Sequence, residues 1–259
     1  EAVALAGEGV PAYLDIGAIV AAALRAECDA VHPGYGFLSE NAAMARACAA
    51  AGLVFVGPTP AQLELFGDKS AALDAARSAD IPTLESVAED DRAGIERLLT
   101  GGPVIVKALA GGGGRGMRVV GEAGALEAAL ESAKREALAA FGDGGVFVER
   151  YLQRTRHVEV QIVGDGNGGV VHLGERDCSL QRRHQKIVEI APAPGIGAKQ
   201  RDALFAAAVR LASSVHYRSL GTFEFLVDRD PDGPIAFIEA NPRLQVEHTI
   251  TEEVTAVDL

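Results

Sequence analysis

The sequence predicts an α/β protein, and three patterns support this prediction. Helix-length amphipathic stretches alternate with short apolar runs up to residue 151, which is typical of sheets covered by helices. From residue 157 onward, single apolar and polar residues alternate, as in 157–162, which indicates antiparallel strands with one buried face and one polar face. Hydrophobic residues make up 48% of the 259 residues, enough for a substantial core.

Residues 1–60 are predicted to be the last part of a domain built on a parallel sheet. A helix over 16–25 precedes the short run 29–31, and Ser39 is expected to cap a helix over 40–51. The short buried strand 53–56 follows. This helix–strand–helix–strand order fits the later part of a parallel sheet, so we expect its first strands to precede this chain.

Residues 61–81 are predicted to be linker helices, over 61–66 and 68–79. Residues 82–151 are predicted to form a small separate unit with strands at 104–107, 117–120 and 146–151 and a helix over 122–141. Residues 152–259 are predicted to form an antiparallel unit with strands at 157–162 and 170–174, a helix over 199–216 and a hairpin of 222–228 with 235–240.

The charge and the cysteines exclude several classes of protein. Lys+Arg 24 and Asp+Glu 36 give a net charge of −12, so a general binder of nucleic acid or anionic membranes would repel its partner. Any phosphate chemistry must therefore lie in a pocket with its own cations. Cys28, Cys48 and Cys178 cannot form a disulfide framework, and no segment is typical of a signal peptide or a membrane span. We expect a cytoplasmic protein with reduced cysteines.

A glycine-rich segment follows the predicted strand that ends at Lys107. Gly111, Gly113 and Gly116 satisfy the GxGxxG pattern, but a strand rather than a helix is expected to follow, so the dinucleotide-binding interpretation fails. A strand–glycine loop–strand unit is instead typical of a flap whose backbone N–H groups close over phosphate oxygens. The alternative is an exposed hairpin. Lys69 is a second candidate for phosphate binding, its alternative being a solvated helix residue.

The last predicted hairpin carries a candidate metal site. If it turns through 230–233, Glu224 lies directly opposite Glu239, and like charges in that position are destabilising unless a cation lies between them. Asn241 would share this face, and hard oxygen ligands near phosphates favour Mg²⁺ or Mn²⁺. The alternative is a pair of solvated glutamates, but the aromatic residues of the hairpin argue against an exposed face.

Two further polar segments stand out. Basic side chains gather between residues 176 and 186: Arg176, Arg182, Arg183, His184 and Lys186. The ordinary interpretation of such a segment is a salt-bridged surface loop. Residues 241–248 place an Arg, a Gln, a Glu and a His just beyond the hairpin, and Pro242 keeps this stretch out of a regular strand.

Taken together, these segments resemble the biotin carboxylase component of biotin-dependent carboxylases, within the ATP-grasp superfamily. The resemblance covers nearly the whole chain in the expected order. It is carried by seven segments: residues 32–41 (HPGYGFLSEN), 66–69 (FGDK), 107 with 111–120, 156–159 (RHVE), 177–186 (DCSLQRRHQK), 191–194 (APAP) and 239–248 (EANPRLQVEH). In such enzymes ATP phosphorylates bicarbonate to carboxyphosphate, which then carboxylates biotin on a carrier protein or domain.

The resemblance implies a nucleotide site and a metal site. The residues implied to hold the nucleotide phosphates are Lys69, Lys107, Gly111, Gly112, Gly113, Gly114, Gly116 and Met117. Glu149 and Leu152 would contact adenine, and the rest of the nucleotide site would be lined by His157, Gln181 and His184. The divalent metals would be held by Glu224, Glu239 and Asn241.

The resemblance also implies the reacting groups. Glu247 would be the general base for bicarbonate, which would be bound by Lys186, Arg243, Gln245 and Val246. Arg243 would also steady carboxyphosphate and biotin. The implied cofactors and substrates are ATP, Mg²⁺ or Mn²⁺, bicarbonate and carrier-bound biotin.

The resemblance also implies binding partners, and it leaves alternative functions to be tested. The implied partners are a biotin carboxyl carrier and a carboxyltransferase, within a homodimer or larger complex. The final acceptor stays open among acetyl-CoA, propionyl-CoA, longer acyl-CoAs, pyruvate and urea. We expect a fragment, because the region that supplies the enolate-stabilising arginine of the family is absent. The rivals are another ATP-grasp ligase of the carbamoyl-phosphate synthase type and an inert nucleotide-binding module.

Overall fold

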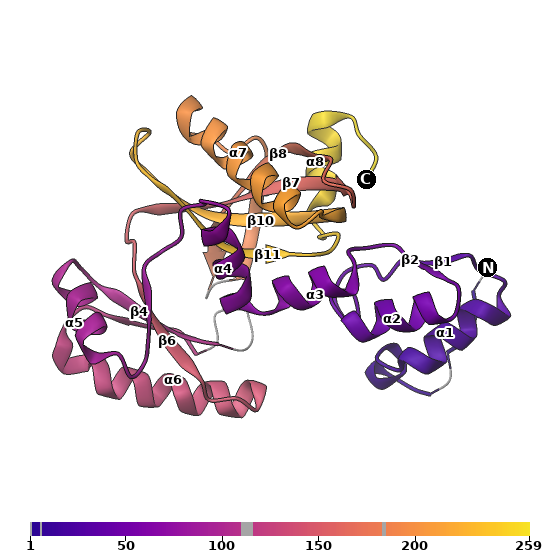
Figure 1. Ribbon diagram of the computed structural model, residues 1–259, viewed down its shortest axis with the longest axis horizontal. Helices are drawn as coiled ribbons and strands as arrows, with labels where there is room; N and C mark the ends of the chain where they lie inside the picture. The colour runs from indigo at the N-terminus through magenta and orange to yellow at the C-terminus, as the bar shows by residue number, and fades with distance from the viewer. Residues whose placement is uncertain (1, 6, 110–115, 183–184) are drawn as a thin grey trace.

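The computed structural model describes residues 2–5, 7–109, 116–182 and 185–259, and its helices and strands form three regions (Figure 1). The first region contains a two-stranded parallel sheet in which Ala30 pairs with Val54. Its elements are the 3₁₀ helix η1 (Val10–Tyr13), α1 (Ile16–Arg25), β1 (Ala30–Val31), α2 (Ala42–Ala50) and β2 (Val54–Phe55). Its core consists of Leu38, Met44, Ala45, Cys48, Leu53, Phe55 and Leu63.

The predicted cap of α2 is wrong by two residues. Asn41, not Ser39, is the N-cap, and its Oδ1 accepts a hydrogen bond from the Met44 N–H at 3.0 Å. An Asn side chain at this position satisfies an N–H of the first turn as well as a Ser would. Ser39 is buried in front of the helix instead.

Two short helices, α3 (Pro60–Gly67) and α4 (Lys69–Ser78), connect the first region to the other two. Asp68 caps α4 and accepts from the Ala71 N–H at 3.0 Å, which places Lys69 at the first position of the helix. Gln62 ties α3 to the far end of the chain, because its Nε2 donates to the carbonyl oxygens of Val215 and His216 at 3.1 and 2.8 Å.

A four-stranded sheet with two helices lies within residues 82–151, which we call the lid. Its elements are β3 (Ser86–Ala88), α5 (Arg92–Thr100), β4 (Val104–Ala108), β5 (Arg118–Val120), η2 (Ala123–Ala125), α6 (Leu126–Phe141) and β6 (Val146–Arg150). The strand order is β3-β6-β4-β5, with antiparallel neighbours. One core is shared by the sheet and helices, with Leu98 and Leu130 packed on Val104, Val106 and Val148.

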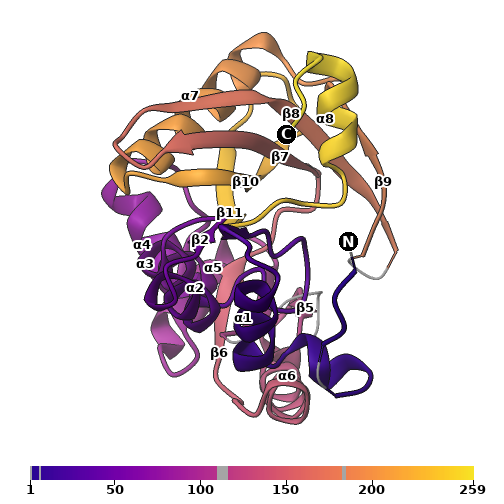
Figure 2. The same cartoon turned by 90° about the vertical axis from the view of Figure 1, so that its right-hand side faces the viewer.

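The last region is a five-stranded antiparallel sheet in the order β11-β10-β7-β8-β9 (Figure 2). Its elements are β7 (Thr155–Asp165), β8 (Val170–Arg182), β9 (Gln185–Ile190), α7 (Ala198–Ser214), β10 (Arg218–Asp228), β11 (Ile235–Asn241) and α8 (His248–Thr255). Of the basic segment, Arg176 and Arg182 lie on β8 and Lys186 on β9, while Arg183 and His184 lie outside the described residues. The surface-loop interpretation is wrong for Arg176, which is buried. No helix in the described part of the chain is long and apolar enough to cross a membrane.

Both faces of β7 are buried, although its residues alternate as predicted. Val158 and Val160 face α7 and pack with Leu204 and Leu211 in the largest core. The polar face, which carries Glu159, is also closed to solvent, because α8 contacts β8 on this side. A polar strand face can be buried when its groups find hydrogen-bond partners, and these partners build the candidate site.

Candidate active site

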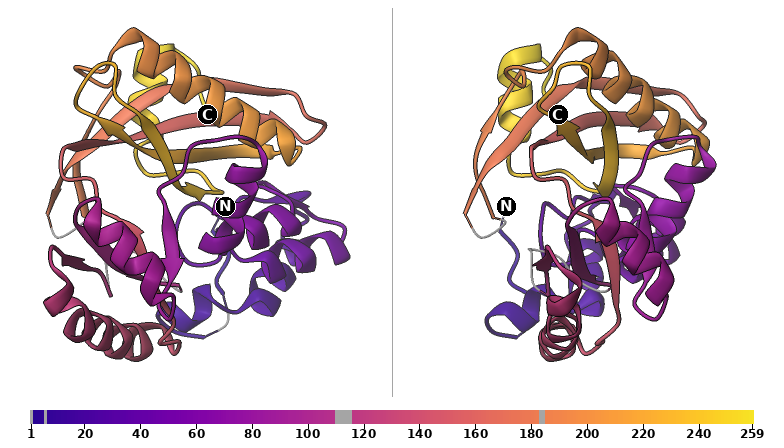
Figure 3. Two further views of the ribbon diagram at one scale, coloured as in Figure 1. Left: turned by 60° about the vertical axis from the view of Figure 1, so that its left-hand side comes forward. Right: turned by 90° about the vertical axis from the view of Figure 1, so that its left-hand side faces the viewer.

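A pocket of about 390 Å³ lies between the lid and the five-stranded sheet, which face each other in Figure 3. Eight predicted site residues line it: Lys69, Lys107, Met117, Glu149, Leu152, His157, Gln181 and Glu239. Apolar side chains complete its walls, among them Leu73, Leu84, Ile105, Leu226 and Ile238. Its size falls within the range of small-molecule sites, and its walls combine apolar side chains with charged groups, among them Lys69 and Lys107.

On the lid side of the pocket, Lys107 forms an ion pair with Glu149. Lys107 stands on β4, and Glu149 on the adjacent strand β6 opposite Ile105. The Glu149 side chain is buried, so it is stable as a carboxylate only beside a cation. The sequence placed Lys107 at the end of a predicted strand, and it did not reveal that Glu149 is the partner.

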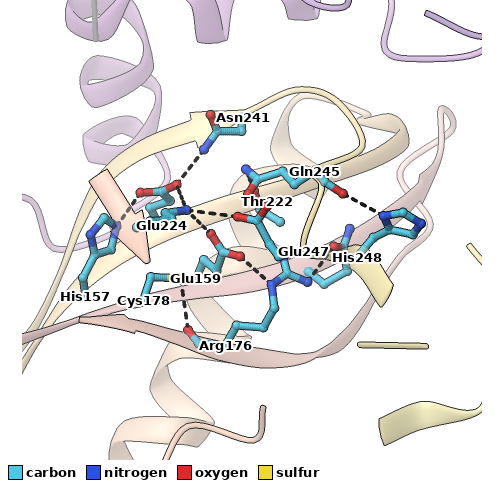
Figure 4. Close-up of polar contacts among 12 residues, drawn as sticks. His157, Glu159, Arg176, Cys178, Thr222, Glu224, Asn241, Gln245, Glu247 and His248 are labelled. Carbon is cyan, nitrogen blue, oxygen red and sulfur yellow. Dashed lines mark hydrogen bonds and ion pairs between the residues drawn. The ribbon is translucent and has the colours of Figure 1, made fainter. Parts of the chain in front are cut away.

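On the opposite side of the pocket, three carboxylates lie directly opposite one another on adjacent strands. Glu159 on β7 pairs with Glu224 on β10, which pairs with Glu239 on β11. The predicted register of Glu224 and Glu239 is therefore confirmed, although the pairing shifts by one residue immediately after Glu224. Such a row of like charges is destabilising without nearby cations, and cations surround the first two members (Figure 4).

Glu224 is buried and accepts from three side chains. Lys186 Nζ and Asn241 Nδ2 lie 2.8 and 2.7 Å from its Oε1, and His157 Nε2 contacts its Oε2. Burial would raise the pKa of Glu224, but the hydrogen bond and charge of His157 and the charge of Lys186 hold it well below the ordinary value. Glu224 is thus an ionised carboxylate under ordinary conditions and a poor proton acceptor.

Nearby cations compensate the negative charge of Glu239 much less than that of Glu224. Its side chain is 39% exposed, and its nearest cation is Lys69, with Nζ 4.0 Å from Oε2. Burial and then the charge of Glu224 raise the pKa of Glu239 above its ordinary value. Excess negative charge therefore remains between Glu239 and Glu224.

The oxygen atoms of this hairpin fit a hard divalent cation. Glu239 supplies a carboxylate whose charge is little compensated, Glu224 lies directly opposite it, and Asn241 Oδ1 lies at the same end of the sheet. Among the described residues, no group of three or more His, Cys, Asp or Glu side chains encloses a metal. An ion held here would need further oxygen ligands, as Mg²⁺ commonly takes from water and substrate phosphates.

Lys186, on β9, contacts three carboxylates beside this hairpin. Its Nζ lies 2.5 Å from Glu159, 2.8 Å from Glu224 and 3.5 Å from Glu247. Burial lowers the pKa of the Lys186 ammonium, but the charges of Glu224 and Glu159 outweigh burial and raise it above the ordinary value. Lys186 is therefore a permanent cation that joins the β10–β11 hairpin to Glu247.

The segment between β11 and α8 positions the remaining predicted residues. Arg243 Nε donates to Glu40 at 2.5 Å, so it contacts the first region of the chain rather than Glu247. The Gln245 side chain is buried and donates to Thr222, whereas Val246 is exposed. Glu247 is the N-cap residue of α8.

Comparison with known proteins identifies the family. Residues 68–259 match the family model "Carbamoyl-phosphate synthase L chain, ATP binding domain", and residues 1–63 match "Biotin carboxylase, N-terminal domain". The chain belongs to the biotin carboxylase family. It is 53% identical to pyruvate carboxylase of Aspergillus niger over 96% of its length, and 48% identical to biotin carboxylase of a Nostoc species over 95% of its length. It spans 21% and 56% of those proteins.

Solved biotin carboxylase structures share the fold. A biotin carboxylase–βγ-ATP complex from Campylobacter jejuni superimposes with a TM-score of 0.88 at 47% identity, over 95% of this chain and 56% of that one. The biotin carboxylase domain dimer of Hydrogenobacter thermophilus 2-oxoglutarate carboxylase, in complex with MgADP, ADP and bicarbonate, gives 0.87 at 42% identity, over 97% and 56%. The ATP-grasp fold predicted from the motifs is thereby confirmed.

Some predicted site residues lie outside the pocket or outside the described residues. Gly111 to Gly114 and His184 lie outside the described residues. Gly116 has a φ of +73° and packs near Ala108 without lining the pocket. The residues that sequence reasoning missed are buried polar ones, chiefly Glu159 and Thr251. The one available signal was the strict alternation in 157–162, which shows that Glu159 shares a strand face with His157.

Proposed function

We propose that this chain performs the ATP-dependent carboxylation of biotin by bicarbonate, through carboxyphosphate, as the first half-reaction of a biotin-dependent carboxylase. The observation that carries the proposal is Lys186, which connects the carboxylates beside the pocket to Glu247. A phosphoryl donor bound in the pocket would thus lie next to a carboxylate placed to remove a proton from the acceptor. Bicarbonate must lose a proton as its oxygen attacks the terminal phosphorus and ADP leaves.

We propose that the pocket holds the nucleotide. Lys69 and Lys107 face it from opposite sides, and an ammonium group on each side suits a chain of phosphates. Adenine would lie against the apolar wall near Leu152, with Glu149 beside it. Met117, His157 and Gln181 would complete the site, as would Gly111 to Gly114, Gly116 and His184. Phosphate binding by Lys107 would weaken its pairing with Glu149.

Glu224, Glu239 and Asn241 would hold Mg²⁺ or Mn²⁺ between the hairpin and the phosphates. When bound, the ion would neutralise charge on the transferring phosphoryl group. Lys186, Arg243, Gln245 and Val246 would orient bicarbonate, and Glu247 would take its proton. Arg243 would also face carboxyphosphate and biotin. After phosphoryl transfer, carboxyphosphate would transfer its carboxyl group to a ureido nitrogen of biotin, with inorganic phosphate leaving and taking the proton of that nitrogen.

The organisation of the whole protein is also proposed. We propose that residues 1–60, 61–81, 82–151 and 152–259 are the end of a pre-ATP-grasp domain, linker helices, a lid and the ATP-grasp body. The partners would be a biotin carboxyl carrier and a carboxyltransferase, in a homodimer or larger complex. Three free cysteines, Cys28, Cys48 and Cys178, suit a reducing cytoplasm.

The test uses the natural full-length protein that contains this chain. We expect ATP cleavage to require bicarbonate and to rise with free biotin, and labelled bicarbonate to appear on biotin. A carbamoyl-phosphate synthase-like ligase would instead require ammonia and yield carbamoyl phosphate. An inert module would bind nucleotide without cleaving it. The match of residues 1–63 to the biotin carboxylase N-terminal domain favours the first result.

A further inference from the structure

Glu247 is held in place by two separate routes. Its side chain contacts the Lys186 ammonium at 3.5 Å. Its backbone is the N-cap of α8, so its position also follows that of the helix. A group that must meet a small, mobile substrate needs both routes, because a correct distance to one cation does not by itself orient a carboxylate.

The helix α8 has a polar anchor. Within α8, all of which the structure describes, Thr251 is the single buried residue, and it is 2% exposed. Its Oγ1 accepts a hydrogen bond from Arg176 Nη1 at 2.7 Å. Arg176 is 1% exposed and stands on β8. A helix of eight residues with so little buried apolar surface depends on such an anchor for its position.

The two routes meet at one buried carboxylate (Figure 4). Arg176 Nε lies 2.5 Å from Glu159 Oε1, and Lys186 Nζ lies 2.5 Å from Glu159 Oε2. Glu159 therefore fixes the distance between Lys186, which contacts the Glu247 side chain, and Arg176, which contacts α8 at Thr251. The contacts close into a ring that runs from Glu247 through Lys186, Glu159 and Arg176 to Thr251, and back along one turn of α8.

We propose that Arg176 and Thr251 are positioning residues that set where the Glu247 carboxylate lies relative to Lys186. This inference rests on the proposed function of Glu247 and deepens it. Thr251 follows Glu247 by one helical turn, so a shift of α8 at Thr251 moves the carboxylate. Displacement of a reacting group by about 1 Å can lower a rate by about 10²-fold. The ring therefore affects the chemical step and leaves the nucleotide pocket unchanged, since neither residue lines that pocket.

The test replaces the Thr251 hydroxyl in the full-length enzyme. Thr251→Val keeps the shape and removes one of the two acceptors of Arg176 Nη1, the other being Gln161 Oε1 at 3.0 Å. We expect kcat for bicarbonate-dependent ATP cleavage to fall by about 10-fold or more, with nucleotide affinity within about two-fold of wild type. Thr251→Ser restores the hydroxyl and should restore kcat. Thr255→Val is the matched control, because the Thr255 hydroxyl bonds only within this segment, to Thr251 O and the Val257 N–H.

Thr251→Ala is a second variant with the same expected loss, in case Thr251→Val does not fold. A folded Thr251→Val or Thr251→Ala enzyme with kcat within about two-fold of wild type would overturn the positioning role. An equal loss in Thr251→Ser would also overturn it, because the hydroxyl would then be irrelevant. Absence of bicarbonate-dependent ATP cleavage in the wild type would instead overturn the proposed function, so the two failures are distinguishable.

Discussion

At the scale of single residues, Glu247 and the hairpin carboxylates differ in what surrounds them. Glu224 accepts from three side chains, and Glu239 faces it across the hairpin. Glu247 contacts one cation, Lys186, whereas Arg243 contacts Glu40. Glu239 would be occupied by the metal in the proposed site, so we propose that Glu247 is the carboxylate of this group that takes the proton of the substrate.

Replacement of Glu247 by Gln should separate binding from chemistry. Glu247→Gln keeps the size and removes the basic oxygen, so nucleotide affinity should stay near wild type. Bicarbonate-dependent ATP cleavage should slow by about 10²–10⁴-fold, as expected for a lost general base. Steady-state kinetics of the full-length enzyme measure this, with Glu253→Gln on the exposed side of α8 as control. Near-normal turnover of Glu247→Gln would refute the assignment.

The two hairpin glutamates should respond oppositely to loss of their charge in metal-free protein. Glu239→Gln removes one of two facing like charges, so the melting temperature in a chelating buffer should rise slightly, while more Mg²⁺ should be needed for activity. Glu224→Gln leaves Lys186 and His157 short of a buried partner and should lower stability, by about 3–5 kcal/mol. Thermal unfolding in EDTA measures both changes. Equal shifts of the two variants would contradict this picture of the hairpin.

The three thiols should differ sharply in reactivity. Cys28 is exposed, whereas Cys48 and Cys178 are buried. Burial raises the pKa of both buried thiols, and the charge of Glu159 raises that of Cys178 further, so little thiolate forms. With a thiol reagent, one cysteine should react rapidly in the native state, and all three should react rapidly in denaturant. Fast reaction of Cys178 in the native chain would contradict the described environment.

At the scale of elements, the sequence predicts most of the fold but not how the polar face of the sheet is used. Apolar periodicity located α1, α6 and α7 to within a few residues, and the facing pair Glu224 and Glu239 followed from the hairpin turn alone. It did not predict α5 or β9, and β8 continues from the predicted end at residue 174 to Arg182. The burial of Glu159 and Arg176 did not follow, because alternation shows which residues share a face but not what covers it. That cover is α8, which is far from β8 in the sequence but contacts it in the folded chain.

Tertiary packing also decides at which residue α2 begins. Ser39 and Asn41 are both good caps, and only the tertiary packing that buries Ser39 decides between them. Local preference therefore predicted that a helix begins here, and the core determined where.

At the same scale, Gln62 should be important for holding α3 against the five-stranded sheet. Its side chain is buried and donates to two carbonyl groups that follow α7, at Val215 and His216. Gln62→Leu leaves both carbonyl oxygens without this donor, so the free energy of unfolding should fall by about 1–3 kcal/mol. Urea unfolding measures this change. Unchanged stability would show that other donors replace the amide.

At the scale of the whole molecule, the pocket lies between two bodies that bring different cations to it. Lys107 belongs to the lid and pairs with Glu149, while Lys69 begins α4 and lies near Glu239. With a net charge of −12, the molecule as a whole repels an anionic ligand. Nucleotide binding must therefore depend on these local lysines, and a phosphate chain that contacts both would couple the lid to the sheet.

This coupling predicts how stability should respond to MgADP. A ligand at about 100 times its Kd stabilises the folded state by about 2.7 kcal/mol, so wild-type melting temperature should rise clearly. Lys69→Met and Lys107→Met should each lose most of this rise. Lys107→Met also leaves the buried Glu149 carboxylate unpaired, so the ligand-induced rise is compared within each variant rather than the melting temperatures themselves. Lys134→Met, which removes a lid cation paired with Glu89 outside this pocket, should keep the full rise. If Lys107→Met kept the full rise and Lys134→Met lost it, the nucleotide would bind elsewhere on the lid.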